Sequence, residues 1–152
     1  MKAGFTYFKN EDIIIAKITP CFENGKGSLC QNLKNGIGFG TTELHVLRAY
    51  DEYERNFMYY WTRSNPFMQI GESMMYGSAG QKRVPTEFIQ EFMITHPKLK
   101  QEQQQISDFL DSQTKLIESQ IESNQKLVTL LQEKRQATIN HAVKRDWILQ
   151  FQ

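Results

Sequence analysis

The stretch that decides the fold is "QEQQQISDFLDSQTKLIESQIESNQKLVTLLQEKRQATINHAVK", residues 101–144, which contains neither glycine nor proline. Its apolar residues recur at seven-residue intervals over five heptads. A heptad repeat of this kind is typical of a helix that forms a coiled coil. We therefore expect a single long helix, about 60–65 Å in length at ~1.5 Å per residue.

This predicted helix is too long to be covered by a domain of about a hundred residues, which is roughly 26 Å across. Most of it needs a partner helix, either from a second copy of the chain or from another part of the same complex. Polar residues at the centre of the apolar stripe would weaken such a coil but fix its register. The residues predicted to form the coiled-coil interface are Ile106, Phe109, Leu110, Leu116, Ile117, Leu127, Leu130 and Leu131.

The first hundred residues have a different pattern, since they hold all nine glycines and all four prolines of the chain. Glycine and proline are the strongest local interruptions of regular structure. Three strands, two helical patterns and intervening turns are expected there. The predicted elements are strands at 12–19, 42–50 and 92–95, a turn region at 33–41, a helix at 51–65 capped by Asp51, a loop at 76–85, and a short helix or turn at 86–91.

The predicted fold class is therefore α+β, with a small mixed globular domain followed by one long C-terminal helix. The boundaries that we expect are 1–100 for the domain, 101–145 for the helix and 146–152 for a C-terminal tail. The β-rich run begins almost at the start of the chain.

Composition excludes several classes of function. The chain of 152 residues is 39% hydrophobic and 12% aromatic, which suits a folded core. It has no apolar run of about 18 residues and no secretory signal pattern, and two cysteines are too few for a disulfide framework. We expect a cytoplasmic protein with free thiols that does not span a membrane. The net charge of +1 is not the basic excess common in nucleic-acid-binding domains, so any phosphate contact must come from local placement.

No catalytic pattern emerges from the residues. The three histidines are scattered, and neither H-E-x-x-H nor Cys-x-x-Cys spacing occurs, so a metal site has no support. There is no G-x-S-x-G elbow and no Walker loop, and the glycines of "GIGFG" at 36, 38 and 40 do not fit G-x-G-x-x-G. The sequence predicts a protein that catalyses nothing and needs no cofactor or metal of its own.

Two polar, glycine-rich loops are the candidate binding elements: "ITPCFENGKG" at 18–27 and "GSAGQKRVP" at 77–85. Lysine and arginine suit phosphate and guanine, whereas asparagine and glutamine suit adenine. Composition alone leaves open the alternative that both loops are solvated connections.

The chain resembles the specificity subunits of type I restriction-modification systems. The resemblance rests on several segments in a set order: 18–27, "NGIGFGTTELHVLR" at 35–48, 76–85, and "HPKLKQEQQQISDFLDSQTKLIES" at 96–119. The segment "LLQEKRQATINHAVKR" at 130–145 resembles the end of that family's long helix. Each segment is modest by itself, but their order is specific and spans nearly the whole chain.

The resemblance implies a non-catalytic subunit that reads double-stranded DNA through a target-recognition domain, here residues 1–100. It also implies partners: a modification subunit that methylates adenine, and a restriction subunit that is a motor and nuclease. S-adenosylmethionine, ATP and magnesium would belong to those partners. The long helix would pair in an antiparallel coiled coil. The residues expected to contact DNA are Lys17, Asn24, Lys26, Gln81, Lys82 and Arg83.

The chain departs from the family pattern because a full specificity subunit holds two recognition domains and two long helices. The family also has many more residues before the β-rich run, so the resemblance implies a recognition domain that is shortened on its N-terminal side. Three explanations are open: a fragment, the product of a split gene, or a natural half-subunit that forms a homodimer. A competing function is also open, in which the chain is a coiled-coil assembly protein, derived from such a subunit, that no longer reads DNA.

Overall fold

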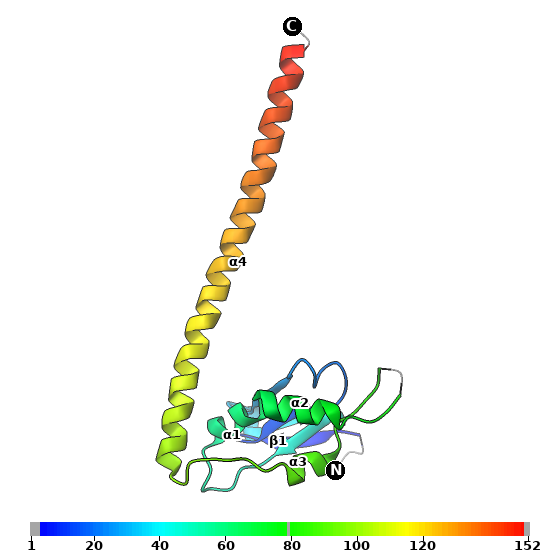
Figure 1. The fold of residues 1–152 in the computed structure, drawn as a ribbon, viewed down its shortest axis with the longest axis vertical. Coiled ribbons are helices and arrows are strands. Elements are labelled where there is room, and N and C mark those ends of the chain that lie inside the picture. The colour runs from blue at the N-terminus through cyan, green and yellow to red at the C-terminus, as the bar shows by residue number, and fades with distance from the viewer. Residues whose placement is uncertain (1–3, 79, 151–152) are drawn as a thin grey trace. The chain divides into compact units, whose positions relative to one another are not determined.

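The structure is a computed structural model that describes residues 4–78 and 80–150. The chain forms two compact units, Met1–Asp108 and Phe109–Gln152. The first unit is a mixed α/β domain with small sheets, and the long helix α4 (Lys100–Gln150) begins within it. The expected combination of a small mixed domain and one long C-terminal helix is confirmed (Figure 1).

A three-stranded antiparallel sheet is built around the β-rich run near the N-terminus. Strand β2 (Ile13–Ala16) lies at its centre, between β3 (Gly27–Leu29) and β5 (Leu44–Leu47). Isoleucines on both faces of β2 suit a central strand, because both of its faces are covered. The strands predicted within 12–19 and 42–50 are confirmed, with shorter bounds.

A second, two-stranded sheet was not predicted. It pairs β1 (Thr6–Lys9) with β4 (Ile37–Gly40), and β4 lies in the segment that we expected to be a turn. Only its start at η1 (Lys34–Gly36) is a turn, with positive φ at Asn35 and Gly36. Sequence patterns miss β4 because glycine disfavours strands. A Cβ at Gly38 would overlap the Phe8 ring, so this strand needs a glycine where Phe8 packs on it.

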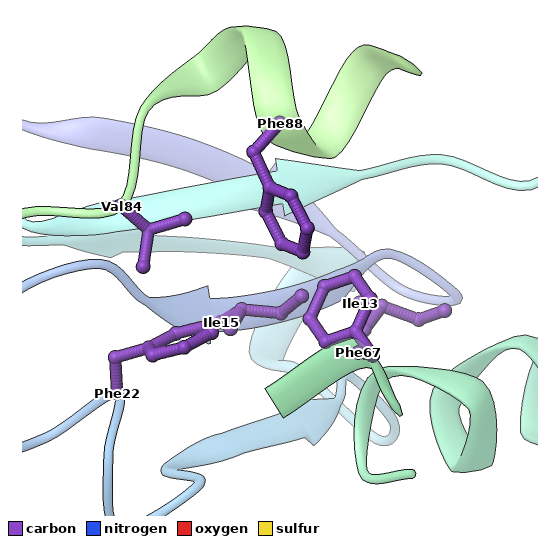
Figure 2. Packing of buried hydrophobic residues seen from close by; sticks show 6 residues of the cluster. All are labelled: Ile13, Ile15, Phe22, Phe67, Val84 and Phe88. Atoms are coloured by element: carbon purple, nitrogen blue, oxygen red, sulfur yellow. The ribbon is translucent and has the colours of Figure 1, made fainter. Parts of the chain in front are cut away.

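The core of the domain lies where β2 meets short helices from later in the chain. Figure 2 shows side chains from β2, from the loop that follows it and from two helices gathered in one cluster. Helix α2 (Asn65–Ser73) and helix α3 (Thr86–Glu91) each contribute a phenylalanine, and the rings of Phe67 and Phe88 are 5.1 Å apart. The buried members of the cluster are Ile13, Ile15, Phe22, Phe67, Val84 and Phe88.

The single helix predicted at 51–65 is wrong in its bounds and in its cap. The chain instead forms α1 (Arg55–Thr62) and then α2, whose second residue is Pro66, which has no N–H with which the first helix could continue. Glu54, and not Asp51, caps α1, since its side chain accepts a hydrogen bond from the Phe57 N–H at 2.6 Å.

The strand predicted at 92–95 is also wrong. The segment has no strand partner, and the Phe92 N–H closes α3 by donating to the Phe88 carbonyl at 3.0 Å. The Phe92 ring packs against Phe67 and Phe88, with centroids 5.1 and 5.3 Å away. Phe92 therefore belongs to the core and not to a sheet, whereas Met93 beside it is exposed. The short helix expected at 86–91 is confirmed as α3.

The first two turns of α4 are held in the domain by buried polar side chains. The Gln103 side chain accepts from the Glu54 N–H at 2.9 Å and donates to the Pro97 carbonyl at 2.9 Å. The Ser107 hydroxyl donates to the Glu54 carboxylate at 2.7 Å. Gln103 and Ser107 are almost fully buried, at 1% and 0% exposure. Helix α4 therefore starts from a closed polar network at the N-terminus of α1.

Helix α4 runs through Gln150, so residues 146–150, which we separated as a tail, are helical in their backbone. Residues 151–152 of that tail lie outside the described residues. Among the helices that the structure describes, none combines the length and the apolar character needed to cross a membrane.

Asp12 ties the two sheets together at the start of β2. Its buried carboxylate receives two hydrogen bonds of 2.7 Å from Arg48 and one of 2.9 Å from the Lys9 N–H. Burial acts to raise the pKa of Asp12, but the bonds from Arg48 and Lys9 outweigh it and hold this pKa below its usual value.

We expect Asp12→Asn to lower the free energy of unfolding at pH 7 by about 1–3 kcal/mol, because charge-assisted hydrogen bonds to a buried carboxylate are lost. Since the pKa of Asp12 is lower in the folded state, its stabilisation is complete above about pH 5 and is lost as the pH falls through the folded-state pKa. Urea denaturation at a series of pH values should therefore show a shallower acid dependence in the variant. Glu52→Gln, at an exposed carboxylate, is the matched control. Equal acid dependence in parent and Asp12→Asn would contradict this role.

Gln103→Leu should destabilise the domain by about 1–3 kcal/mol, because it leaves the buried Glu54 N–H without its partner and removes a hydrogen bond to the Pro97 carbonyl, which then has only His96 Nδ1 as a side-chain partner among the described residues. Chemical denaturation of the full chain measures this change. Gln105→Leu, at an exposed position on the same helix, should change stability by less than about 0.5 kcal/mol. Similar stability in the two variants would mean that the polar network does not hold α4.

Candidate functional site

The two glycine-rich loops that were predicted separately are joined by backbone hydrogen bonds. The Val84 N–H donates to the Lys17 carbonyl at 2.8 Å, and the Thr19 N–H donates to the Lys82 carbonyl at 3.0 Å. The Lys82 N–H returns a bond of 3.2 Å to the Thr19 hydroxyl. Residues 17–26 therefore form one continuous surface with 76–78 and 80–84.

The second loop is itself a narrow hairpin. Tyr76 and Arg83 exchange backbone hydrogen bonds of 2.8 and 3.2 Å, and both take part in isolated bridges, Arg83 also with Ile18. Residue 79 at its tip lies outside the described residues. The Thr19 hydroxyl also donates to the Gly80 carbonyl. The 80–84 side of the hairpin is thus fixed to the first loop.

The first loop is anchored by a phenylalanine and exposes the polar residues around it. Phe22 is fully buried in the core, whereas Glu23, Asn24 and Lys26 are exposed. The Lys26 N–H donates to the Cys21 carbonyl at 2.9 Å, and Lys26 also accepts from the Ala16 N–H at 2.9 Å. This closed backbone holds the exposed side chains on a defined surface.

Gly25 in this loop has a φ of 60°, in the left-handed region that favours glycine. Arg63 directly follows α1, and its guanidinium lies against this loop. A Cβ at position 25 would overlap that guanidinium. A side chain at position 25 would therefore disturb both the turn and its contact with Arg63.

Glu43 connects the two loops from outside both of them. Its carboxylate accepts two hydrogen bonds of 2.9 Å, from Nε and Nη2 of Arg83, while its carbonyl accepts from the Lys17 N–H at 3.1 Å. The hydrogen bonds from Arg83 and, secondarily, the nearby positive charges lower the pKa of Glu43 although partial burial opposes this. The same pairing raises the pKa of Arg83. Both groups are therefore charged at neutral pH.

A surface recess of about 460 Å³ lies where the loops meet α2. Gly71 makes this approach possible, because a Cβ on it would come within 2.5 Å of the Phe22 ring. The recess carries two carboxylates, one amide, one hydroxyl and one lysine. It is lined by Glu23, Gln69, Glu72, Ser73, Met75 and Lys82.

The structure places the predicted contact residues in one region, with differences in exposure. Asn24, Lys26, Gln81 and Lys82 are exposed, whereas Lys17 and Arg83 are partly buried. Within the described part of the chain, neither Lys26 nor Lys82 forms an ion pair.

Sequence reasoning missed two sets of residues at this surface. Gln69 and Glu72 lie on α2, a helix that the sequence pattern did not separate from the preceding one. Glu43 was missed because its role depends on Arg83, forty residues later in the chain. The only signal in the sequence for α2, and so for Gln69 and Glu72, was Pro66, because proline favours the first turn of a helix.

His45 and Cys30 lie away from solvent and are structural. His45 is buried, its Nε2 lies 3.0 Å from the Val84 carbonyl, and burial lowers its pKa. Burial also raises the pKa of the Cys30 thiol, which makes it less reactive. No group of histidine, cysteine or acidic side chains that could hold a metal ion occurs among the described residues.

The residues predicted for a coiled coil lie on α4 with their side chains uncovered in this single chain. Leu110 is partly exposed, and the others expose 38–65% of their surface. The exposed residues of the predicted interface are Ile106, Phe109, Leu116, Ile117, Leu127, Leu130 and Leu131.

Comparison with known proteins gives two kinds of match. The family model described as the type I restriction modification DNA specificity domain matches residues 2–129. The chain is 53% identical over 107 residues to the EcoAI type I restriction enzyme specificity subunit of Escherichia coli, covering 70% of this chain and 18% of that protein. It is 50% identical over 99 residues to the EcoEI specificity subunit of the same organism, covering 64% of this chain and 16% of that protein.

The chain thus spans less than a fifth of the length of these curated relatives. No solved structure was found to match it. The family model covers most of the chain, including both loops and the first part of α4. The chain therefore belongs to the family of type I restriction-modification DNA specificity domains.

Proposed function

We propose that this chain recognises a DNA sequence as part of the specificity subunit of a type I restriction-modification complex. It would direct adenine methylation and restriction that partner subunits carry out. The observation that carries the proposal is that the two candidate loops form one exposed, polar surface in a chain of this family.

The chemistry of this surface suits duplex DNA. Lys26 and Lys82 are exposed cations on flexible side chains that can approach phosphates, and Lys17 lies at the base of the first loop. Asn24 and Gln81 are exposed amides, which can pair with the N6 and N7 edge of adenine in the major groove. Arg83 belongs to the same surface. Gln69 on α2 adds a third amide, in the recess that Lys82 also lines.

The low net charge of the chain limits how this surface can bind. With a formal charge of +1, attraction to DNA must come from the few lysines on the loops. Each phosphate contact releases counterions and makes the affinity dependent on salt concentration. We therefore propose a small number of phosphate contacts and a moderate salt dependence.

The partners follow from the family and from the uncovered helix. We propose 1–100 as the target-recognition domain and 101–145 as a helix that pairs in an antiparallel coiled coil. The partner is a second copy of the chain or the remaining half of a specificity subunit. An antiparallel homodimer would place identical reading surfaces in a symmetric pair, which suits a divided palindromic site.

Catalysis and cofactors belong to other subunits in this proposal. Specificity subunits are the non-catalytic components of type I systems. The modification subunit would bring S-adenosylmethionine and transfer the methyl group, and the restriction subunit would bring ATP and magnesium.

A second candidate function is a coiled-coil assembly protein that does not read DNA. The recess between the loops favours it, because Glu23 and Glu72 place negative charge next to the lysine that would meet a phosphate. This alternative predicts a stable dimer without preference for any DNA sequence.

Methylation mapping separates the two functions. The chain is expressed in cells with its modification subunit, and methylated adenines are located by long-read sequencing. A methylated sequence motif that depends on the chain supports DNA reading. A soluble, folded chain that produces no motif supports the assembly function.

Lys26→Ala combined with Lys82→Ala should weaken DNA binding and make the slope of log K against log salt less negative by about 1.8, at ~0.9 for each lost phosphate contact. Binding of the full chain to duplex DNA is measured at several salt concentrations. Lys34→Ala combined with Lys98→Ala changes the charge equally at exposed positions outside both loops. If both pairs of substitutions have the same effect, the loop lysines are not specific contacts.

Leu116→Glu combined with Leu130→Glu should prevent self-association of the full chain, because each charge would be buried in the proposed seam. Sedimentation measures the association state. Ser119→Glu combined with Gln132→Glu adds two charges on α4 outside the heptad rows and should leave association unchanged. A parent chain that remains monomeric at all concentrations would leave the missing half of the subunit as the proposed partner and would argue against a homodimer.

A further inference from the structure

We propose that Glu43 is a positioning residue that sets the spacing between the two loops, and that Arg83 acts through Glu43 without touching DNA. This inference rests on the proposed function, since it concerns how the same surface recognises a sequence. It divides the surface into residues that contact DNA and a pair that holds them in place.

Glu43 is placed where it can control both loops. It directly precedes β5, outside 17–26 and 76–84. Its carbonyl receives the Lys17 N–H at the base of the first loop, and its carboxylate receives Arg83 at the base of the second. No other residue of the surface described above binds both loops through its backbone and its side chain.

Arg83 is embedded in the protein through all three guanidinium nitrogens. Nε and Nη2 donate to the Glu43 carboxylate at 2.9 Å, and Nη1 donates to the Gln81 carbonyl at 3.2 Å. An arginine reads guanine with two parallel N–H donors. Three of its five N–H donors are bonded within the protein, including both donors of the Nε–Nη2 edge, so reading a base through that edge would require the pair with Glu43 to break.

The backbone of Arg83 confines it further. It exchanges two hydrogen bonds with Tyr76 across the hairpin, next to the strand-like contact between 17–19 and 82–84. The side chains of Arg83 and Glu43 are 38% and 32% exposed. Lys26 and Lys82, by contrast, are exposed. The bidentate pair fixes the distance between Glu43, in the turn before β5, and Arg83 in the hairpin.

The two groups of residues should affect binding in different ways. Lysine contacts with phosphate tolerate small shifts because the side chain is long and flexible. Contacts with base edges require closer placement, since each depends on paired donors and acceptors in the groove. Loss of the Glu43–Arg83 pair should therefore reduce sequence preference and leave the salt dependence unchanged.

The test compares conservative variants of the full chain: Glu43→Gln, Arg83→Gln and Lys82→Gln, together with the charge-swapped double variant Glu43→Arg with Arg83→Glu. The DNA motif is first selected by the parent chain from a randomised duplex pool. Each variant is then titrated with the selected duplex and with a scrambled duplex at several salt concentrations. Amide hydrogen exchange at Thr19 and Lys82 reports loop separation without any DNA.

We expect Glu43→Gln and Arg83→Gln each to lower the preference for the selected duplex by about tenfold or more, which is the scale of one lost base contact. Their slopes of log K against log salt should equal that of the parent, whereas Lys82→Gln should make this slope less negative by about 0.9. The charge-swapped variant should recover most of the preference, because it restores the pair. Exchange at Thr19 and Lys82 should become at least about tenfold faster in Glu43→Gln, and slower again in the double variant.

Several outcomes would overturn the inference. A reduced salt slope in Arg83→Gln would make Arg83 a phosphate contact, and unchanged preference in Glu43→Gln would remove its positioning role. If the parent selects no motif, the proposed function fails, and the exchange rates still decide whether Glu43 holds the loops together. Unchanged exchange in Glu43→Gln would reject the inference in that case as well.

Discussion

The antiparallel contact between residues 17–19 and 82–84 is the constraint on which the rest of the surface depends. Its three backbone and hydroxyl hydrogen bonds, of 2.8 to 3.2 Å, join segments more than sixty residues apart. Val84 lies in the core directly beside this contact, and Phe22 anchors the loop on its other side. The exposed polar residues are therefore displayed from a rigid, buried base. Two separate solvated loops would have to lose much more conformational entropy on binding DNA.

The domain uses buried polar groups where a larger protein would use more apolar contact. Asp12 with Arg48 joins the two small sheets, and Glu54 with Gln103 and Ser107 receives the start of α4. Each buried donor or acceptor is costly if its partner is lost, so these networks specify geometry as well as stability. Helix α4 continues from such a network with apolar residues uncovered, and the proposed coiled coil would cover them.

Arg83 illustrates why site residues are hard to assign from sequence. Its position in a glycine-rich loop next to Lys82 suggests a DNA contact, and the resemblance to specificity subunits strengthens that expectation. In the structure its guanidinium donates hydrogen bonds to the Glu43 carboxylate and to the Gln81 carbonyl. Lysines 26 and 82 carry the same charge but form no ion pair within the described residues. Charge alone therefore does not separate a contact residue from a positioning residue, because the difference depends on a partner far away in the chain.

The sequence by itself determined the two-part organisation, the central strands, the glycine-rich loops and the long helix, because each depends on local periodicity or on glycine and proline. The family likewise followed from the order of short segments. Only the tertiary structure decided which segments pair. Strand β4 forms where Phe8 packs over Gly38. Phe92 packs in the aromatic core although its segment has a strand-like sequence, and Glu43 forms an ion pair with Arg83. These outcomes depend on contacts between residues far apart in the chain, which no local pattern contains.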